Sequence, residues 1–281
     1  MPSGPTDRRR EVPDEGWVRR LPPSRWPGDG TGNNAHNCTP ATSSLKPARQ
    51  PDEIGGHCRW LDVRAGEVVE ELHQENNQIV IAGVGCVCTA TPAMHFDRFQ
   101  AAHGRAAATA EGVKRVRPNV LVFAYQGDGD AYTIGIAESM NAAYRNENIT
   151  QFVINNVNFG MTGGQMSWTT LPGQKTETSV NGRNCELTGM PFHFPEMVAN
   201  SKGFHVAYAA RGAVIDAKTI NQTKRMIRNA LEAQLNGEGY SVVEVLSPCP
   251  TNWHMSPKQC REQIAGQIMA EYPLGEFKTR G

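Results

Sequence analysis

Hard oxygen ligands stand where the sequence predicts the ends of two strands. Asp128 belongs to the string GDGD, directly after the apolar run NVLVFAYQ, and Asn156 and Asn158 follow the apolar run ITQFVIN. The carboxylate of Asp128, the amide oxygen of Asn156 and the backbone carbonyl of Asn158 are ligands of the kind that Mg²⁺ takes from proteins, with phosphate and water completing its shell. This arrangement predicts a magnesium site.

Glycines around Asp128 suit the site to a diphosphate. Gly127 and Gly129 let such an anion approach the backbone closely. The helix expected to begin near Ala131 directs its N-terminal N–H groups and its dipole toward that anion. Asp130 stands at the start of this helix, where it either caps N–H groups or contacts the cofactor.

Spacing excludes two other uses of the string GDGD and leaves one open. Counted from Asp128, the sixth and twelfth positions of a calcium loop would be Thr133 and Ser139 rather than glycine and glutamate. The dinucleotide fingerprint G-x-G-x-x-G does not occur in this string. A turn with solvated aspartates stays open for GDGD alone, but the asparagine pair after the next strand favours the metal site.

The elements that position these residues alternate between helix and strand from about residue 63 onward. Apolar runs predict strands at residues 78–85, 119–126, 149–156, 204–210 and 240–248. Helical periodicity predicts helices at residues 63–75, 99–118, 133–146, 220–235 and 256–273, the last with Ser256 as its N-cap. The continuous apolar strands are typical of a parallel sheet covered on both faces, and such sheets bind ligands at the carboxyl ends of their strands. The aperiodic stretch 162–195 is expected to be a functional or interfacial loop.

Composition narrows the class of protein. The 281 residues carry 28 basic and 28 acidic side chains, so bulk charge favours neither nucleic acid nor an anionic membrane as a partner. No apolar run is long enough for a transmembrane helix, and the N-terminus has no apolar segment typical of a secretory signal. The odd number of cysteines, 7, favours free thiols or metal ligands in a reducing cytoplasm. Residues 1–60 lack periodicity, and we expect an irregular, poorly ordered segment there, followed by one domain over residues 61–281.

Several strings resemble one family. HGRAAATAEGVKRVRPNVLVFAYQGDGD and NNVNFGMTGGQMSWTTLPGQKT look like the thiamine diphosphate-binding β subunit of 2-oxoacid:ferredoxin oxidoreductases, as do VEVLSPCPTNW and YPLGEFK. GMTGGQ is much more specific than GDG followed by NN, which many thiamine enzymes share. The resemblance covers residues 65–281 and implies a three-layer α/β/α thiamine diphosphate-binding fold with a mostly parallel sheet.

The resemblance also implies roles for individual residues. Asp128 and Asn156 would ligate Mg²⁺ through their side chains, and Asn158 through its carbonyl. The remaining matched residues line or approach the cofactor in the family: Gly127, Gly129, Thr162, Gly163, Gly164, Gln165, His103 and Arg105. For His103, an ordinary helix-surface or core histidine stays open as an alternative.

The activity implied by the resemblance is oxidative decarboxylation of a 2-oxoacid, with the acyl group passed to coenzyme A and electrons passed to ferredoxin through iron–sulfur clusters. The glutamate that activates the cofactor lies on another subunit in the family, so the catalytic residue is expected outside this chain. The expected partners are an α subunit and a γ or ferredoxin-like subunit. Branched-chain 2-oxoacids and 2-oxoglutarate both stay open as substrates.

The cysteines match the family only in part. Cys86 in GVGC and Cys249 in SPC match two ligands of the [4Fe–4S] cluster that the β subunit commonly holds, whereas the N-terminal C-P-G-C pair is missing. Either Cys58 and Cys38 reach the cluster from a rearranged N-terminus, or Cys86 and Cys249 are buried thiols without a cluster. A further hypothesis is that residues 1–60 are not the family's native N-terminus, because family-like sequence begins abruptly near residue 65.

Two other functions stay open. The chain could be half of a non-oxidative thiamine-dependent decarboxylase divided over two chains. It could also be a cofactor-free assembly subunit.

Overall fold

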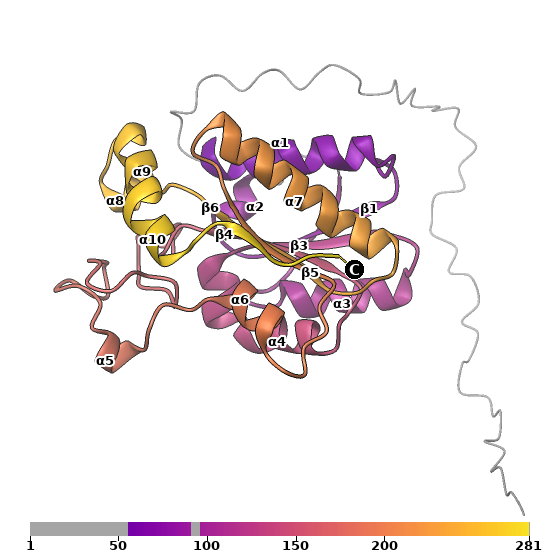
Figure 1. The fold of residues 1–281 in the computed structure, drawn as a ribbon, viewed down its shortest axis with the longest axis horizontal. Coiled ribbons are helices and arrows are strands. Elements are labelled where there is room, and N and C mark those ends of the chain that lie inside the picture. The colour runs from indigo at the N-terminus through magenta and orange to yellow at the C-terminus, as the bar shows by residue number, and fades with distance from the viewer. Residues whose placement is uncertain (1–55, 91–95, 281) are drawn as a thin grey trace, which may run out of the picture. The chain divides into compact units, whose positions relative to one another are not determined.

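A parallel sheet forms the centre of the domain (Figure 1). The structure is a computed structural model that describes residues 56–90 and 96–280. Within these residues the strand order is β2-β1-β3-β4-β6-β5-β7, and every neighbouring pair is parallel except β5 and β7. The strands are β1 (Gln78–Ala82), β2 (Asp97–Gln100), β3 (Leu121–Gly127), β4 (Thr150–Asn155), β5 (Tyr208–Ala213), β6 (Ser241–Leu246) and β7 (Gly275–Lys278).

Helices cover both faces of this sheet, which gives three layers (Figure 1). One face carries α1 (Gly56–Glu71), α2 (Cys86–Ala90) and α7 (Ala217–Leu235). The other carries α3 (Ala106–Val116), α4 (Ile136–Tyr144) and α6 (Phe194–Asn200). The fold is therefore the three-layer α/β/α fold with a mostly parallel sheet that the sequence predicted.

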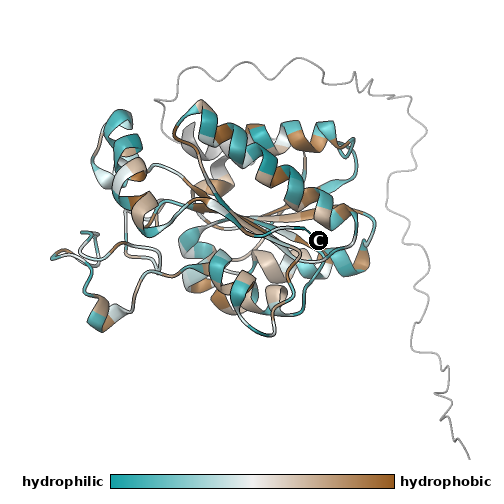
Figure 2. Ribbon diagram, viewed as in Figure 1, coloured by the Kyte–Doolittle hydropathy of each residue, from teal (hydrophilic) through white to brown (hydrophobic). Residues whose placement is uncertain are grey.

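Two hydrophobic cores explain why the strand sequences are continuously apolar. In β3, Leu121 and Phe123 pack with α1 and α7, while the alternate residues Val122 and Ala124 pack with α3 and α4. Successive side chains of a strand point to opposite faces of the sheet. A strand that is covered on both faces therefore has no solvent-facing position that would favour a polar residue. Figure 2 shows hydrophobic residues on the strands and hydrophilic residues along the outward faces of α1 and α7.

Strands β1, β4 and β6 lie within their predicted ranges, and β3 lies close to its own, whereas other boundaries differ. The helix predicted over residues 99–118 begins only at Ala106, because residues 97–100 form β2, an exposed edge strand without an apolar pattern. The strand predicted over residues 204–210 lies at Tyr208–Ala213. Its end was missed because Arg211 is charged and yet fully buried. The edge strand β7 was not predicted.

The segment after β3 is also not the simple helix that the sequence predicted. A π-helical turn runs from Gly129 to Ile134 and continues into α4. Such turns are frequent at functional sites because they shift the register of the helix locally. Here the turn begins directly after Asp128.

Short helices close the carboxyl end of the chain. They are α8 (Pro250–Trp253), α9 (Pro257–Gln263), a π-helical segment (Ile264–Ile268) and α10 (Met269–Glu271). Ser256 caps α9 as predicted, because its hydroxyl accepts the N–H of Gln259. Ile264, Ile268 and Tyr272 pack in a third core with Val157 from the loop after β4. The predicted loop 162–195 is mainly irregular, apart from the short α5 (Cys185–Thr188) and the start of α6.

Most of the segment for which poor order was expected lies outside the described residues, and α1 already begins at Gly56. Within the described part of the chain, no helix is long and apolar enough to cross a membrane.

Candidate functional site

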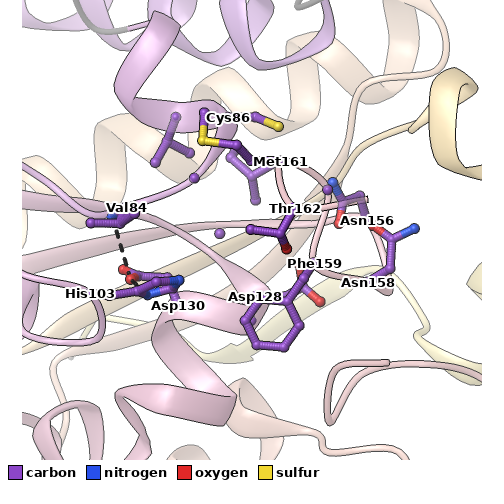
Figure 3. Close-up of a pocket in the computed structure, with 16 residues that line it drawn as sticks. Val84, Cys86, His103, Asp128, Asp130, Asn156, Asn158, Phe159, Met161 and Thr162 are labelled. Atoms are coloured by element: carbon purple, nitrogen blue, oxygen red, sulfur yellow. Dashed lines mark hydrogen bonds and ion pairs between the residues drawn. The ribbon is translucent and has the colours of Figure 1, made fainter. Parts of the chain in front are cut away.

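A pocket lies at the carboxyl ends of β1, β3 and β4, where the sequence placed its ligands (Figure 3). In Figure 3, Asp130 and His103 lie on one side of the pocket and Asn156 and Asn158 on the other. The pocket is lined by Val84, Gly85, Cys86, Val87, His103, Gly127, Asp128, Gly129, Asp130, Ile154, Asn156, Asn158, Phe159, Gly160, Met161 and Thr162.

Asp128 is a buried carboxylate with one oxygen committed to the protein. Oδ2 accepts the hydroxyl of Ser167 at 2.7 Å and that of Thr169, and only 1% of the residue is exposed. Burial raises the pKa of Asp128 to about 6, although the two hydroxyls act in the opposite direction. Oδ1 accepts neither of these hydroxyls and faces Asn156.

The Asn156 side chain brings the three predicted ligands together. One terminal atom of its amide lies 3.1 Å from Asp128 Oδ1, 2.7 Å from the backbone carbonyl oxygen of Asn158 and 3.1 Å from Asn158 Oδ1. With nitrogen in this position the amide donates to these oxygens, whereas with oxygen in this position several oxygens converge. Oxygens this close together repel one another unless a cation lies among them.

These separations fit Mg²⁺. An octahedral magnesium ion with ligands at about 2.1 Å places neighbouring oxygens roughly 3 Å apart. Within residues 56–90 and 96–280, no group of three or more His, Cys, Asp or Glu side chains could hold a metal ion. A cation in this pocket would therefore depend on amide and carbonyl oxygens beside the single carboxylate of Asp128.

The glycine-rich loop after Asn158 only partly lines the pocket. Thr162 lies in the wall, whereas Gly163, Gly164 and Gln165 do not. Gly163 and Gly164 have φ values of +111° and +92°, which residues other than glycine rarely adopt. Gln165 donates to the Thr162 carbonyl at 2.8 Å and accepts its hydroxyl, so it closes the loop.

His103 and Arg105 of the HGR string have different surroundings. His103 lines the pocket, and its Nδ1 contacts Asp130 Oδ1. Arg105 does not line the pocket; its guanidinium pairs with Glu138 and is half exposed. Asp130 does not serve the helix that it begins, because its carboxylate accepts the N–H groups of Gly104 and Val84 from two other segments.

The thiols divide between described and undescribed parts of the chain. Cys86 lies in the pocket wall, and burial together with the Cys249 and Cys88 thiols raises its pKa. Burial likewise raises the pKa of Cys249, whose sulfur accepts the Asn252 amide at 3.4 Å. Cys38 falls outside the described residues, and the side chain of Cys58 does so too although its backbone belongs to α1.

Residues 78–245 match the model of the C-terminal TPP-binding domain of thiamine pyrophosphate enzymes. This range contains β1, β3, β4 and the pocket between them. The chain belongs to the thiamine pyrophosphate enzyme family. Within it, the chain is similar to subunits of 2-oxoacid oxidoreductases, as the following relatives show.

The curated relatives of this chain are named as subunits of larger enzymes. Ketoisovalerate oxidoreductase subunit VorA of Methanothermobacter marburgensis is 38% identical over 215 residues, covering 76% of this chain and 45% of the relative. The 2-oxoglutarate synthase subunit KorB of Archaeoglobus fulgidus is 36% identical, covering 67% of this chain and 66% of the relative. The β subunit of a 2-oxoacid:ferredoxin oxidoreductase of Saccharolobus solfataricus is 32% identical, covering 66% and 57%. The chain spans about half the length of the VorA relative.

A solved structure agrees with the fold of the family. The 2-oxoglutarate:ferredoxin oxidoreductase from Magnetococcus marinus, with 2-oxoglutarate, coenzyme A and succinyl-CoA bound, matches with a TM-score of 0.61 and 21% identity. The match covers 84% of this chain and 83% of that one. At this identity the likeness concerns the fold.

Sequence reasoning missed several residues that shape this thiamine pyrophosphate family site. Ser167 and Thr169 are hydroxyl partners of Asp128 from a loop about 40 residues away in sequence. Phe159 packs under Gly129, where a Cβ atom would lie 2.5 Å from its ring. Serine and threonine are common in loops, so nothing in the string MSWTTLPG singled out the two that face the carboxylate.

Proposed function

We propose that this chain is the thiamine diphosphate- and Mg²⁺-binding subunit of a 2-oxoacid:ferredoxin oxidoreductase. The observation that supports it most directly is the convergence of Asp128 Oδ1, the Asn156 amide and the Asn158 carbonyl at the end of the parallel sheet. The complete enzyme would convert a 2-oxoacid to acyl-CoA and CO₂ and pass electrons to ferredoxin. Bound thiamine diphosphate would supply the electron sink for loss of CO₂.

The residues of this chain would hold and orient that group. Asp128, Asn156 and the Asn158 carbonyl would hold Mg²⁺ against the diphosphate, and Gly127 and Gly129 would let the diphosphate approach the backbone. The π-helical turn that starts at Gly129 would offer the N–H groups of its first turn to the same anion. Thr162, which lies in the pocket wall, would lie beside the diphosphate.

Partner subunits complete the proposed enzyme. We propose an α subunit that carries the cofactor-activating glutamate and a γ or ferredoxin-like subunit. The choice between branched-chain 2-oxoacids and 2-oxoglutarate is proposed to be shared with the α subunit, since relatives of both kinds match at similar identity. A [4Fe–4S] cluster on Cys86, Cys249 and thiols of the N-terminal segment is part of the proposal, and so is the cytoplasmic location.

The test is purification of the chain with its partner subunits, followed by a panel of 2-oxoacids with ferredoxin or a viologen as the electron acceptor. The expected result is reduction of the acceptor that requires coenzyme A, thiamine diphosphate and Mg²⁺. Release of CO₂ without reduction of the acceptor would instead support the non-oxidative decarboxylase.

A binding measurement separates the enzyme from an assembly subunit. Thiamine diphosphate and Mg²⁺ are titrated into the complex, with Asp128→Ala as the site variant and Glu75→Gln as an exposed-acid control. Binding that is lost in Asp128→Ala and kept in Glu75→Gln supports the site. No binding by the wild-type complex would support the assembly subunit, and unchanged binding by Asp128→Ala would refute the assignment of the site.

A further inference from the structure

The turn that carries Asn156 and Asn158 depends on an unfavourable backbone conformation. Val157, between them, has a φ of +54°. A β-branched residue is an outlier in the left-handed region, and such residues persist only where their surroundings impose the conformation. The conformation matters because it sets the directions in which the residues before and after Val157 point.

Two hydrogen bonds fix the peptide groups on either side of Val157. Its N–H donates to Asn155 Oδ1 at 3.0 Å, and its carbonyl accepts the Thr170 hydroxyl at 2.7 Å. The Val157 side chain itself is 1% exposed and packs in the third core with Leu246 and Tyr272. The bond from the Val157 N–H to Asn155 Oδ1 closes a local turn at the end of β4.

The Asn155 side chain is itself held from inside the protein. Its amide nitrogen donates to Glu244 Oε1 at 3.1 Å, and the same oxygen accepts Arg211 Nε at 2.6 Å. Glu244 and Arg211 are fully buried, and Asn155 is 1% exposed. These residues stand on adjacent strands, since Arg211 pairs with Glu244 in the β5–β6 register and Asn155 ends β4 beside β6.

Arg211 is anchored at its other end. Its guanidinium donates to Glu196 Oε2 at 2.7 Å and to the Pro273 carbonyl at 3.2 Å. The Tyr272 ring lies 5.0 Å from its central carbon. A continuous set of contacts therefore runs from α6 and the C-terminal segment to the turn beside the pocket.

Stability alone explains such an array poorly. A buried ion pair must overcome the desolvation of both charges, and replacement by packed apolar residues is often neutral or stabilising. What an apolar replacement could not provide is a fixed acceptor for the amide of Asn155.

We propose that Arg211, Glu244 and Asn155 form a positioning array that holds Val157 in the left-handed conformation and so directs Asn156 and Asn158 to the cation site. The identity of the cation as the Mg²⁺ of thiamine diphosphate rests on the proposed function. The array does not touch the cation. It acts through the backbone of one residue, and a glycine at that residue removes the need for it.

The first experiment asks whether glycine at residue 157 suppresses the effect of losing Asn155. It is done in the complex with partner subunits. We expect Asn155→Ala to raise the Mg²⁺ concentration that gives half-maximal thiamine diphosphate binding by about tenfold or more, the equivalent of one good hydrogen bond to the turn. Val157→Gly in the same chain is expected to restore most of that affinity, because glycine adopts positive φ without strain. The melting temperature without metal is expected to stay low in the double variant, because the buried valine side chain is lost.

A matched control stands at the other end of the same strand. Asn148 also donates its amide to a carbonyl, that of Gln234 at 3.0 Å, but lies before β4 rather than after it. Asn148→Ala is expected to lower the melting temperature and leave the Mg²⁺ dependence unchanged. Glu244→Gln, which keeps an acceptor for Asn155 and loses the charge, is expected to shift the Mg²⁺ dependence less than Asn155→Ala.

The second measurement needs neither metal nor cofactor. Amide hydrogen exchange of a peptide covering residues 156–160 in the metal-free complex should be faster in Asn155→Ala than in wild type and unchanged in Asn148→Ala. Wild-type exchange in Asn155→Ala, an unchanged Mg²⁺ dependence in that variant, or a double variant that binds no better than Asn155→Ala, would each overturn the positioning array. The exchange differences could also appear as expected while the wild-type complex binds no thiamine diphosphate. That result would overturn the proposed function and the link to the cation, but the role of the array in holding Val157 would stand.

Discussion

The carboxylate of Asp130 contacts the imidazole of His103, and the two residues come from different segments of the chain. Asp130 Oδ1 lies against His103 Nδ1, with the aspartate side chain 1% exposed and the histidine 33% exposed. The same carboxylate accepts the N–H of Gly104 at 2.7 Å and the amide of Gln126 at 2.6 Å. Asp130 therefore fixes one wall of the pocket rather than capping its own helix.

This wall leaves no space for a side chain at Gly83. A Cβ atom there would lie 2.2 Å from Asp130 Oδ2 and 3.0 Å from Gln126 Cγ. We expect Gly83→Ala to lower the free energy of unfolding by about 1–3 kcal/mol, because the carboxylate must shift away from its partners. Chemical denaturation measures this difference. Gly112→Ala is the matched control, since a Cβ meets nothing within 4 Å at that helical position, and a gain of about 0.5–1 kcal/mol is expected. Equal stability of the two variants would contradict the tight contact.

Asp128→Asn should separate stability from metal binding. Burial raises the pKa of Asp128 to about 6, so at pH 8 the metal-free fold bears the cost of an ionised buried carboxylate. The neutral amide removes this cost, and we expect the metal-free variant to gain up to about 3 kcal/mol in the free energy of unfolding. It should at the same time lose Mg²⁺-dependent binding of thiamine diphosphate. Thermal melts without metal and titrations with metal check the two halves, and a variant that loses both would point to a packing role alone.

The same pKa predicts how metal binding depends on pH. Above pH about 6 Asp128 is ionised and ready for a cation, whereas below that value a proton must leave before Mg²⁺ binds. The Mg²⁺ concentration for half-saturation should therefore rise about tenfold for each pH unit below 6 and change little above it. Titrations across this range measure the dependence. Mg²⁺ binding by free thiamine diphosphate over the same range corrects for protonation of the diphosphate. A flat corrected profile would show that Asp128 does not bind the ion.

The contacts of His193 predict that the protein loses stability as the pH rises. Hydrogen bonding to Glu196 raises the pKa of His193, as does its contact with Glu271 at 3.0 Å, against the effect of burial. A raised folded-state pKa contributes stability below the ordinary value near 6.5, and this contribution is lost as the pH rises through the raised pKa. His193→Gln should flatten the fall in melting temperature over this range, whereas the exposed control His205→Gln should leave it unchanged. A wild-type slope in His193→Gln would exclude this contact as its source.

The sequence by itself determined the sheet, its covered faces and the strand ends at which the pocket lies. Residues 119–126 and 149–156 are mainly apolar, because strands covered on both sides bury most of their side chains in the two cores. Asp128, Asn156 and Asn158 were identifiable because the carboxyl ends of neighbouring parallel strands meet at one edge. The edge strands β2 and β7 were not identifiable, since exposed strands carry no apolar period.

Only the tertiary structure decided which polar residues support the site. Ser167 and Thr169 reach Asp128, and Glu244 reaches Asn155, across sequence separations that no local pattern records. Arg211 resembled a surface residue in a strand, and its burial depends on carboxylates from β6 and α6. The physical reason is common to all of them. A buried polar group is stabilised by partners brought close only by the fold, whereas the apolar period of a strand is written into consecutive residues.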